Sequence, residues 1–119
     1  MIQHSVFATN IFVEDDFIDK SISSDMKQYI EQMWTIREYD NNWQTEPDLH
    51  TKPAFEKFAE KVIQKSKEQI KLLDYDVEDI AITDMWGNVL RNKEAHPPHT
   101  HSNNFLSGVY YLYSDKAAG

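Results

Sequence analysis

The sequence contains no cysteine, and this absence excludes several kinds of chemistry. Without thiols the 119-residue chain has no disulfide framework, no thiolate metal site and no cysteine nucleophile. Such a composition suits a reducing compartment. Glycine is scarce as well, with three in the whole chain, and neither a glycine-rich phosphate loop nor a dinucleotide-binding fingerprint is present.

Positive charge is also in short supply. The chain has 12 Lys and Arg residues against 20 Asp and Glu residues, which gives a net charge of −8 at pH 7. This balance repels phosphate backbones and anionic lipids, so we expect neither nucleic acid nor a membrane as partner. No apolar run approaches the roughly 20 residues that span a bilayer, and the N-terminus lacks the pattern of a signal peptide. These features predict a cytoplasmic protein.

Apolar residues are plentiful enough for one hydrophobic core. They make up 40% of the chain, and aromatic residues make up 13%, so a single domain over residues 1–119 is expected. A strand is predicted at residues 5–13, closed by an acidic turn. A helix is predicted from Ser24, with Ser23 or Ser24 as its cap, because apolar residues recur at helical spacing at Met26, Tyr29, Ile30, Met33 and Trp34.

The second half of the chain predicts one long helix and two further strands. Residues 38–53 read as a packed connection that contains Trp43 and Leu49. Thr51 is a candidate cap for the second helix, with Pro53 in its first turn. The spacing then changes to two at residues 80–83, which predicts a strand followed by a turn at residues 87–88. The continuous apolar run at residues 105–113 predicts a strand covered on both faces.

Three of the five histidines lie within six positions, directly before this last run, in EAHPPHTHSNNFLSGVYYLYS at residues 94–114. At the start of a strand, His99 and His101 would point to the same face and could converge on one ion. Pro97 and Pro98 stiffen the approach. Imidazole ligands suit iron, zinc, copper and nickel, so this pair predicts a metal site without naming the metal.

Other interpretations of the polar residues stay open or are weaker. A His-x-His pair alone is more often two surface histidines than a metal site. His96 is a candidate third ligand, although two prolines separate it from His99. His4 and His50 have no partner at ligand spacing and are interpreted as surface or capping residues. The acidic stretch at residues 74–79 lacks the glycine and the terminal glutamate of a calcium loop, so we interpret it as a solvated turn.

The sequence resembles a family of 2-oxoglutarate- and Fe(II)-dependent oxygenases from marine bacteria and their phages. The resemblance is carried by residues 85–112, MWGNVLRNKEAHPPHTHSNNFLSGVYYL, in which a W-x-N element precedes H-x-H and S-G-V-Y-Y-L. The upstream segment NNWQTEPDLH, residues 41–50, is also similar to a W-Q-S/T segment of that family. The resemblance implies an α+β fold in which an N-terminal strand and two helices pack on a double-stranded β-helix, or jelly roll.

The resemblance also implies the cofactors and the residues that bind them. His99 matches the first Fe(II) ligand, and His101 stands where the wider superfamily has a carboxylate and this family has H-x-H. Tyr111 matches a position that hydrogen-bonds 2-oxoglutarate in related hydroxylases. Val109 shares its face of the strand and would line the same pocket. The implied function is that of a dioxygenase that hydroxylates an unknown substrate, and the resemblance assigns no catalytic side chain to this chain.

Two parts of the family pattern are missing from this chain. Family members continue with further strands, a distal His and an Arg that binds the far carboxylate of 2-oxoglutarate. We therefore expect an incomplete jelly roll: a C-terminally truncated chain, a fragment, or a protomer that completes its sheet with a partner. The unpaired edge of the 105–113 strand predicts a homodimer. The alternative function is a non-catalytic metal-binding or structural jelly-roll module.

Overall fold

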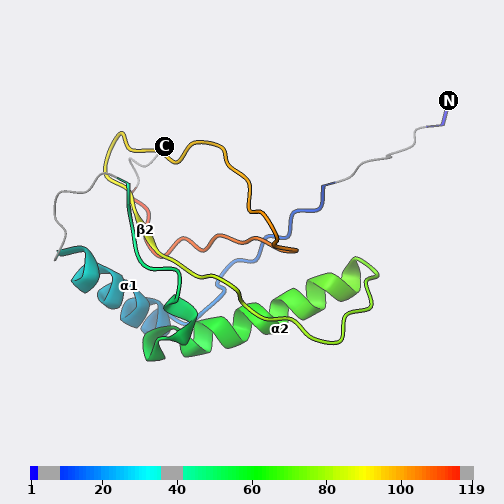
Figure 1. Cartoon of the computed structure of the whole chain (residues 1–119), viewed down its shortest axis with the longest axis horizontal. Helices are drawn as coiled ribbons and strands as arrows, with labels where there is room; N and C mark the ends of the chain where they lie inside the picture. Colours follow the sequence, from blue (N-terminus) through cyan, green and yellow to red (C-terminus); the bar gives the residue numbers. More distant parts are fainter. Residues whose placement is uncertain (3–8, 36–41, 116–119) are drawn as a thin grey trace.

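Two helices form the largest part of the regular structure (Figure 1). The computed structural model describes residues 1–2, 9–35 and 42–115. Helix α1 runs over Lys20–Thr35 and helix α2 over Glu56–Leu72. Their inner faces supply most of a small core: Met26 and Ile30 from α1, and Phe58, Ala59 and Ile70 from α2. Neither helix is long and apolar enough to cross a membrane, and this holds for every helix among the described residues.

Helix α1 keeps the predicted apolar stripe but begins four residues earlier than expected. Ser23 and Ser24 lie inside the helix, so the predicted cap is wrong; the Ser23 amide instead donates to the Asp19 carbonyl at 3.0 Å. The reason is the apolar residue that precedes the helix. Phe17 packs edge-to-face on Phe58, with ring centroids 5.7 Å apart, and this contact brings the chain onto the core before the serines.

Helix α2 begins later than its predicted cap. Two 3₁₀ turns, η1 at Leu49–Thr51 and η2 at Pro53–Phe55, precede it. The Thr51 hydroxyl donates to the Asp48 carbonyl at 2.7 Å rather than capping α2. Leu49 and Phe55 are each 2% exposed, and the two short turns allow both side chains to enter the core. Burial of these side chains outweighs the capping preference of a threonine.

The sheet consists of two short antiparallel strands, β1 at Trp43–Gln44 and β2 at Asn88–Val89, with Trp43 opposite Val89. Trp43 is 5% exposed, which confirms that the connection between the helices packs on the core over its described part, residues 42–53. The predicted turn at residues 87–88 is therefore wrong, because Asn88 belongs to a strand. The described residues are α+β in character, and their sheet contains no more than these two strands.

Three predicted strands are not formed among the described residues. Residues 3–8 lie outside them, and residues 9–13 are exposed and belong to no helix or strand. Residues 80–83 run back along α2 as an irregular segment (Figure 1). Residues 105–113, called the C-terminal segment below, form no ladder either. Each run has strand composition but no neighbouring strand with which to pair, and a strand depends on such a neighbour.

The C-terminal segment is covered on one face, not on two as predicted. Tyr110 and Leu112 pack against the core, and the Tyr110 ring lies 5.2 Å from that of Phe58. Val109 and Tyr111 are each 79% exposed. This alternation is that of an extended chain with a buried and an open face. The continuous apolar composition predicted burial of both faces, and the open face has no covering layer among the described residues.

Candidate functional site

A backbone clamp joins the loop before η1 to the segment that leads into β2. The Met85 amide donates to the Pro47 carbonyl, and the Leu49 amide donates to the Met85 carbonyl, both at 3.0 Å. Two residues later, the Thr45 amide donates to the Gly87 carbonyl and the Gly87 amide donates to the Thr45 hydroxyl, again at 3.0 Å. We call these four bonds the clamp. They hold the backbone on both sides of the residue between Met85 and Gly87.

The histidines follow β2 on a loop bounded by two turns. The first turn closes when the Glu94 amide donates to the Arg91 carbonyl at 3.0 Å and the Arg91 amide donates to the Glu94 carboxylate at 2.8 Å. The second turn contains Asn103 with φ of 64°, a left-handed conformation that asparagine tolerates better than most residues. His99 and His101 lie between these turns, directly after the two prolines.

The structure brings the imidazoles of His99 and His101 together. Their Nε2 atoms are 3.2 Å apart, and the ring centroids are separated by 4.9 Å at an interplanar angle of 62°. The His99 Nδ1 atom lies 3.0 Å from the Pro97 carbonyl oxygen. A carbonyl oxygen only accepts hydrogen bonds, so the proton of a neutral His99 ring resides on Nδ1 and its Nε2 lone pair faces His101.

Sequence reasoning assigned no role to Trp86, yet its indole is part of this site. The indole stacks on the His101 ring, with centroids 5.5 Å apart and planes inclined by 25°. Trp86 is the residue that the clamp holds on both sides. The available signal was its position in the W-x-N element, but the sequence did not indicate which later residue its ring would contact.

The other histidines do not complete a metal site. The His96 ring is centred 6.3 Å from that of His99, and no group of three or more His, Asp or Glu side chains over residues 1–2, 9–35 and 42–115 is arranged to hold a metal. His50 is half-buried, and its Nδ1 atom is enclosed without a hydrogen-bond partner among the described residues; the interpretation of His50 as a surface or capping residue stays a prediction. His4 lies outside the described residues.

The two residues expected to bind the cosubstrate are far more exposed than the core and form no converging pair. Val109 and Tyr111 lie on the open face of the C-terminal segment, both largely exposed to solvent. Their spacing by two puts them on one face, as predicted. They line no closed pocket at this degree of exposure, and their role in binding 2-oxoglutarate stays a prediction.

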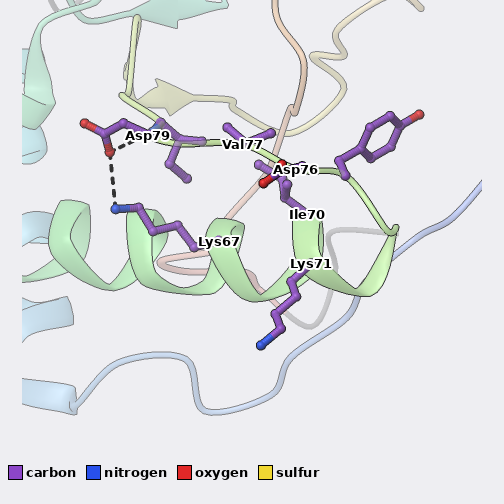
Figure 2. Close-up of a pocket in the computed structure, with 8 residues that line it drawn as sticks. Lys67, Ile70, Lys71, Asp76, Val77 and Asp79 are labelled. Carbon is purple, nitrogen blue, oxygen red and sulfur yellow. Dashed lines mark hydrogen bonds and ion pairs between the residues drawn. The ribbon is translucent and has the colours of Figure 1, made fainter.

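The acidic turn after α2 forms ordinary structural contacts. Residues 75–77, 79 and 80 and the last turns of α2 line a shallow pocket of about 310 Å³, shown in Figure 2. The Asp79 carboxylate accepts the Ile80 amide at 2.8 Å and pairs with the Lys67 ammonium at 3.2 Å (Figure 2). These two contacts, the backbone bond foremost, lower the pKa of Asp79 below its ordinary value. The contacts tie the turn to α2 and leave Asp79 neutralised by a cation.

Another carboxylate with a shifted pKa lies beside the clamp. The Asp48 carboxylate accepts a hydrogen bond from Lys52 at 2.6 Å, and this contact lowers the pKa of Asp48 and raises that of Lys52. Asp48 also forms an isolated parallel bridge with Met85. The ion pair therefore stabilises the loop to which the clamp attaches, and both of its partners are committed to it.

The described residues are thus α+β in character, with the indole of a clamped tryptophan stacked on one of two converging histidines. Residues 84–119 match a family described as "Putative 2OG-Fe(II) oxygenase". This match covers Trp86, the histidine loop and the C-terminal segment, and it supports a resemblance to 2-oxoglutarate- and Fe(II)-dependent oxygenases over these residues. Members of such a family use Fe(II) and 2-oxoglutarate. Searches of curated proteins and of solved structures find no significant match to the chain.

Proposed function

We propose that this chain contributes two iron ligands to a 2-oxoglutarate-dependent dioxygenase. The reaction of this class consumes 2-oxoglutarate and O₂ and yields succinate, CO₂ and a hydroxylated substrate. The observation that carries the proposal is the convergence of the His99 and His101 Nε2 atoms inside the stretch that matches the oxygenase family. The substrate itself is not indicated by any described residue.

The donor geometry fits a transition-metal ion. Imidazole nitrogens bind such ions at about 2.0–2.1 Å, so two nitrogens at adjacent positions on one ion lie about 3 Å apart. The observed separation of 3.2 Å agrees with this requirement. His99 and His101 would hold Fe(II), which when bound supplies the redox chemistry that the oxidative decarboxylation needs.

The protein's own contribution is to aim both nitrogens. The Pro97 carbonyl accepts the His99 Nδ1 proton and so leaves Nε2 as the ligand atom. The His101 Nε2 atom lies 3.2 Å from His99 Nε2, and a ring nitrogen binds a metal through a lone pair, so Nε2 of each ring would carry no proton in the loaded site.

A larger β-structure is part of the proposal. Thr83 donates its hydroxyl proton to the Asn104 side-chain oxygen at 3.0 Å. Trp86 contacts His101, and three residues earlier Thr83 contacts Asn104, which lies three residues after His101. The two segments therefore run in opposite directions in register, as neighbouring antiparallel strands do. This registration supports neighbouring strands of a jelly roll for a domain that includes residues 1–119. Val109 and Tyr111 would then face 2-oxoglutarate.

A non-catalytic metal-binding or structural module is the second candidate. The described residues bring only two ligand side chains together, and two imidazoles leave most positions of an ion to solvent. For the same reason we expect weak Fe(II) binding and no measurable succinate formation by the 119-residue chain alone. Robust succinate formation would show that further side chains of the chain complete the iron site.

The deciding experiment is an anaerobic Fe(II) titration with and without 2-oxoglutarate. Replacement of His99 or His101 by Ala should weaken Fe(II) binding more than tenfold, whereas His50→Ala serves as the matched control and should bind as the parent does. A charge-transfer band that appears only with 2-oxoglutarate supports the oxygenase. Metal binding without that band favours the non-catalytic module, and equal affinities in all variants contradict the site.

A further inference from the structure

We propose that Trp86 is a positioning residue that sets the plane of the His101 ring and thereby fixes where a divalent cation binds. The inference rests on the proposed function, because it concerns the same histidine pair. It assigns a role to a side chain that would not itself touch the ion. The contact that carries it is the stack of the two rings, with centroids 5.5 Å apart and an inclination of 25°.

The two histidines are oriented by different means. The loop itself orients His99, because the Pro97 carbonyl two residues earlier binds its Nδ1 atom. His101 makes two ring contacts among the described residues, one with His99 and one with Trp86. A ring stack at this distance is an attractive aromatic contact and restricts rotation about the second side-chain torsion. Trp86 therefore fixes the orientation of the His101 ring, as the Pro97 carbonyl fixes that of the His99 ring.

Trp86 is suited to this role because its backbone is well anchored. The clamp bonds Met85 and Gly87, on either side of it, to the loop before η1. The histidine loop has no comparable support: no backbone-to-backbone hydrogen bond joins residues 95–104 to any other residue that the structure describes. The firmly anchored Trp86 indole thus packs against the weakly supported His101 ring. The position of Trp86 therefore sets that of His101, and not the reverse.

A second tie prevents the loop from sliding along the indole. The hydrogen bond between Thr83 and Asn104 lies three residues from the stack on each segment. The two contacts together fix both the distance and the registration of the loop against residues 83–86. The consequence is that removal of the Trp86 ring should release the orientation of His101 while the loop stays attached through Asn104.

The test compares three tryptophan variants of the full chain. Trp86→Leu removes the stacking surface, Trp86→Phe retains an aromatic face, and Trp34→Leu removes a half-buried tryptophan elsewhere in the core. The first measurement needs no metal: NMR of the imidazole protons reports the ring-current shift that a stacked indole imposes on His101. The second measures Ni(II) affinity by calorimetry, and far-UV circular dichroism checks that each variant folds.

We expect Trp86→Leu to abolish the ring-current shift of the His101 protons and to weaken Ni(II) binding about tenfold, in the range found when supporting contacts of metal ligands are removed. Trp86→Phe should restore most of the affinity, and Trp34→Leu should change neither quantity. Helical content should be unaffected in all three variants, which a role in general stability would not predict.

The His101 signals and the Ni(II) affinities together distinguish a wrong positioning role from a wrong metal site. If Trp86→Leu leaves the His101 signals in place, the positioning role is refuted whatever the metal data show. The role is also refuted if the signals shift but Ni(II) affinity stays at the parent value while His99→Ala and His101→Ala lose affinity. If those two histidine variants bind Ni(II) as the parent does, the metal site itself is wrong, and the positioning role fails with it.

Discussion

Replacement of Thr45 by Val tests the clamp that supports the candidate site. Thr45 is 6% exposed, and its hydroxyl accepts the Gly87 amide at 3.0 Å and donates to the Glu46 carbonyl at 2.9 Å. Valine has nearly the same shape but no hydroxyl, so the half-buried Gly87 amide loses its acceptor. An unsatisfied buried donor costs about 1–3 kcal/mol. Because Gly87 is only half-buried, we expect a loss near the lower end, about 1–2 kcal/mol.

The assay is equilibrium unfolding in urea, followed by tryptophan fluorescence and far-UV circular dichroism. Thr45→Ser is the control, since it retains the hydroxyl and removes one methyl group, at a cost of about 0.8 kcal/mol or less. The free energy of unfolding should decrease more for Thr45→Val than for Thr45→Ser. A valine variant as stable as the parent, or more stable than the serine variant, would refute the view that this hydrogen bond stabilises the clamp.

Three further outcomes follow from the structure. A Cβ atom on Gly87 would lie 2.6 Å from the Ile30 Cδ1 atom, so Gly87→Ala should lower the free energy of unfolding by about 1–3 kcal/mol. The Ile30→Val variant lacks the Cδ1 atom, so in a double-mutant cycle it should recover part of this loss. Additive effects of the two substitutions would contradict the clash. The C-terminal segment is uncharged and has no backbone partner among residues 1–2, 9–35 and 42–115, so light scattering should detect self-association that Ser107→Pro reduces. A parent chain that stays monomeric at all concentrations would show that its edge is covered. The lowered pKa of Asp79 contributes stability that is present above the ordinary pKa of an aspartate and is lost as the pH falls through the lowered pKa. Asp79→Asn should therefore lose less stability than the parent as the pH falls from neutral through the acid range, and parallel curves of stability against pH would contradict this.

The helices could be predicted from the sequence because their signal is local. The apolar stripe of α1 and the long periodic face of α2 each bury one side against the core, and both follow from spacing alone. Their starts are displaced because tertiary contacts decide them. Phe17 brings the first helix forward, and burial of Leu49 and Phe55 in 3₁₀ turns delays the second.

The strands were predicted less well because strand formation depends on a partner. Residues 80–83 and the C-terminal segment have strand composition, but pairing occurs at β1 and β2 instead. Each of these strands has two residues, too few for a periodic signal. The histidine pair, in contrast, could be proposed from its spacing and the neighbouring prolines. The stack with Trp86 could not, because it joins residues 15 positions apart in the chain through a loop without regular structure.

The clamp also bears on the order in which the candidate site is assembled during folding. Its bond between Gly87 and Thr45 joins residues 42 positions apart, and closing a loop of that length costs about 3 kcal/mol of chain entropy. The contacts within each helix are local, so we expect the helices to form first and the clamp to close after them. The loop that carries His99 and His101 gains its support through Trp86 only at that stage. A metal ion bound there would therefore slow unfolding and leave the rate of folding almost unchanged.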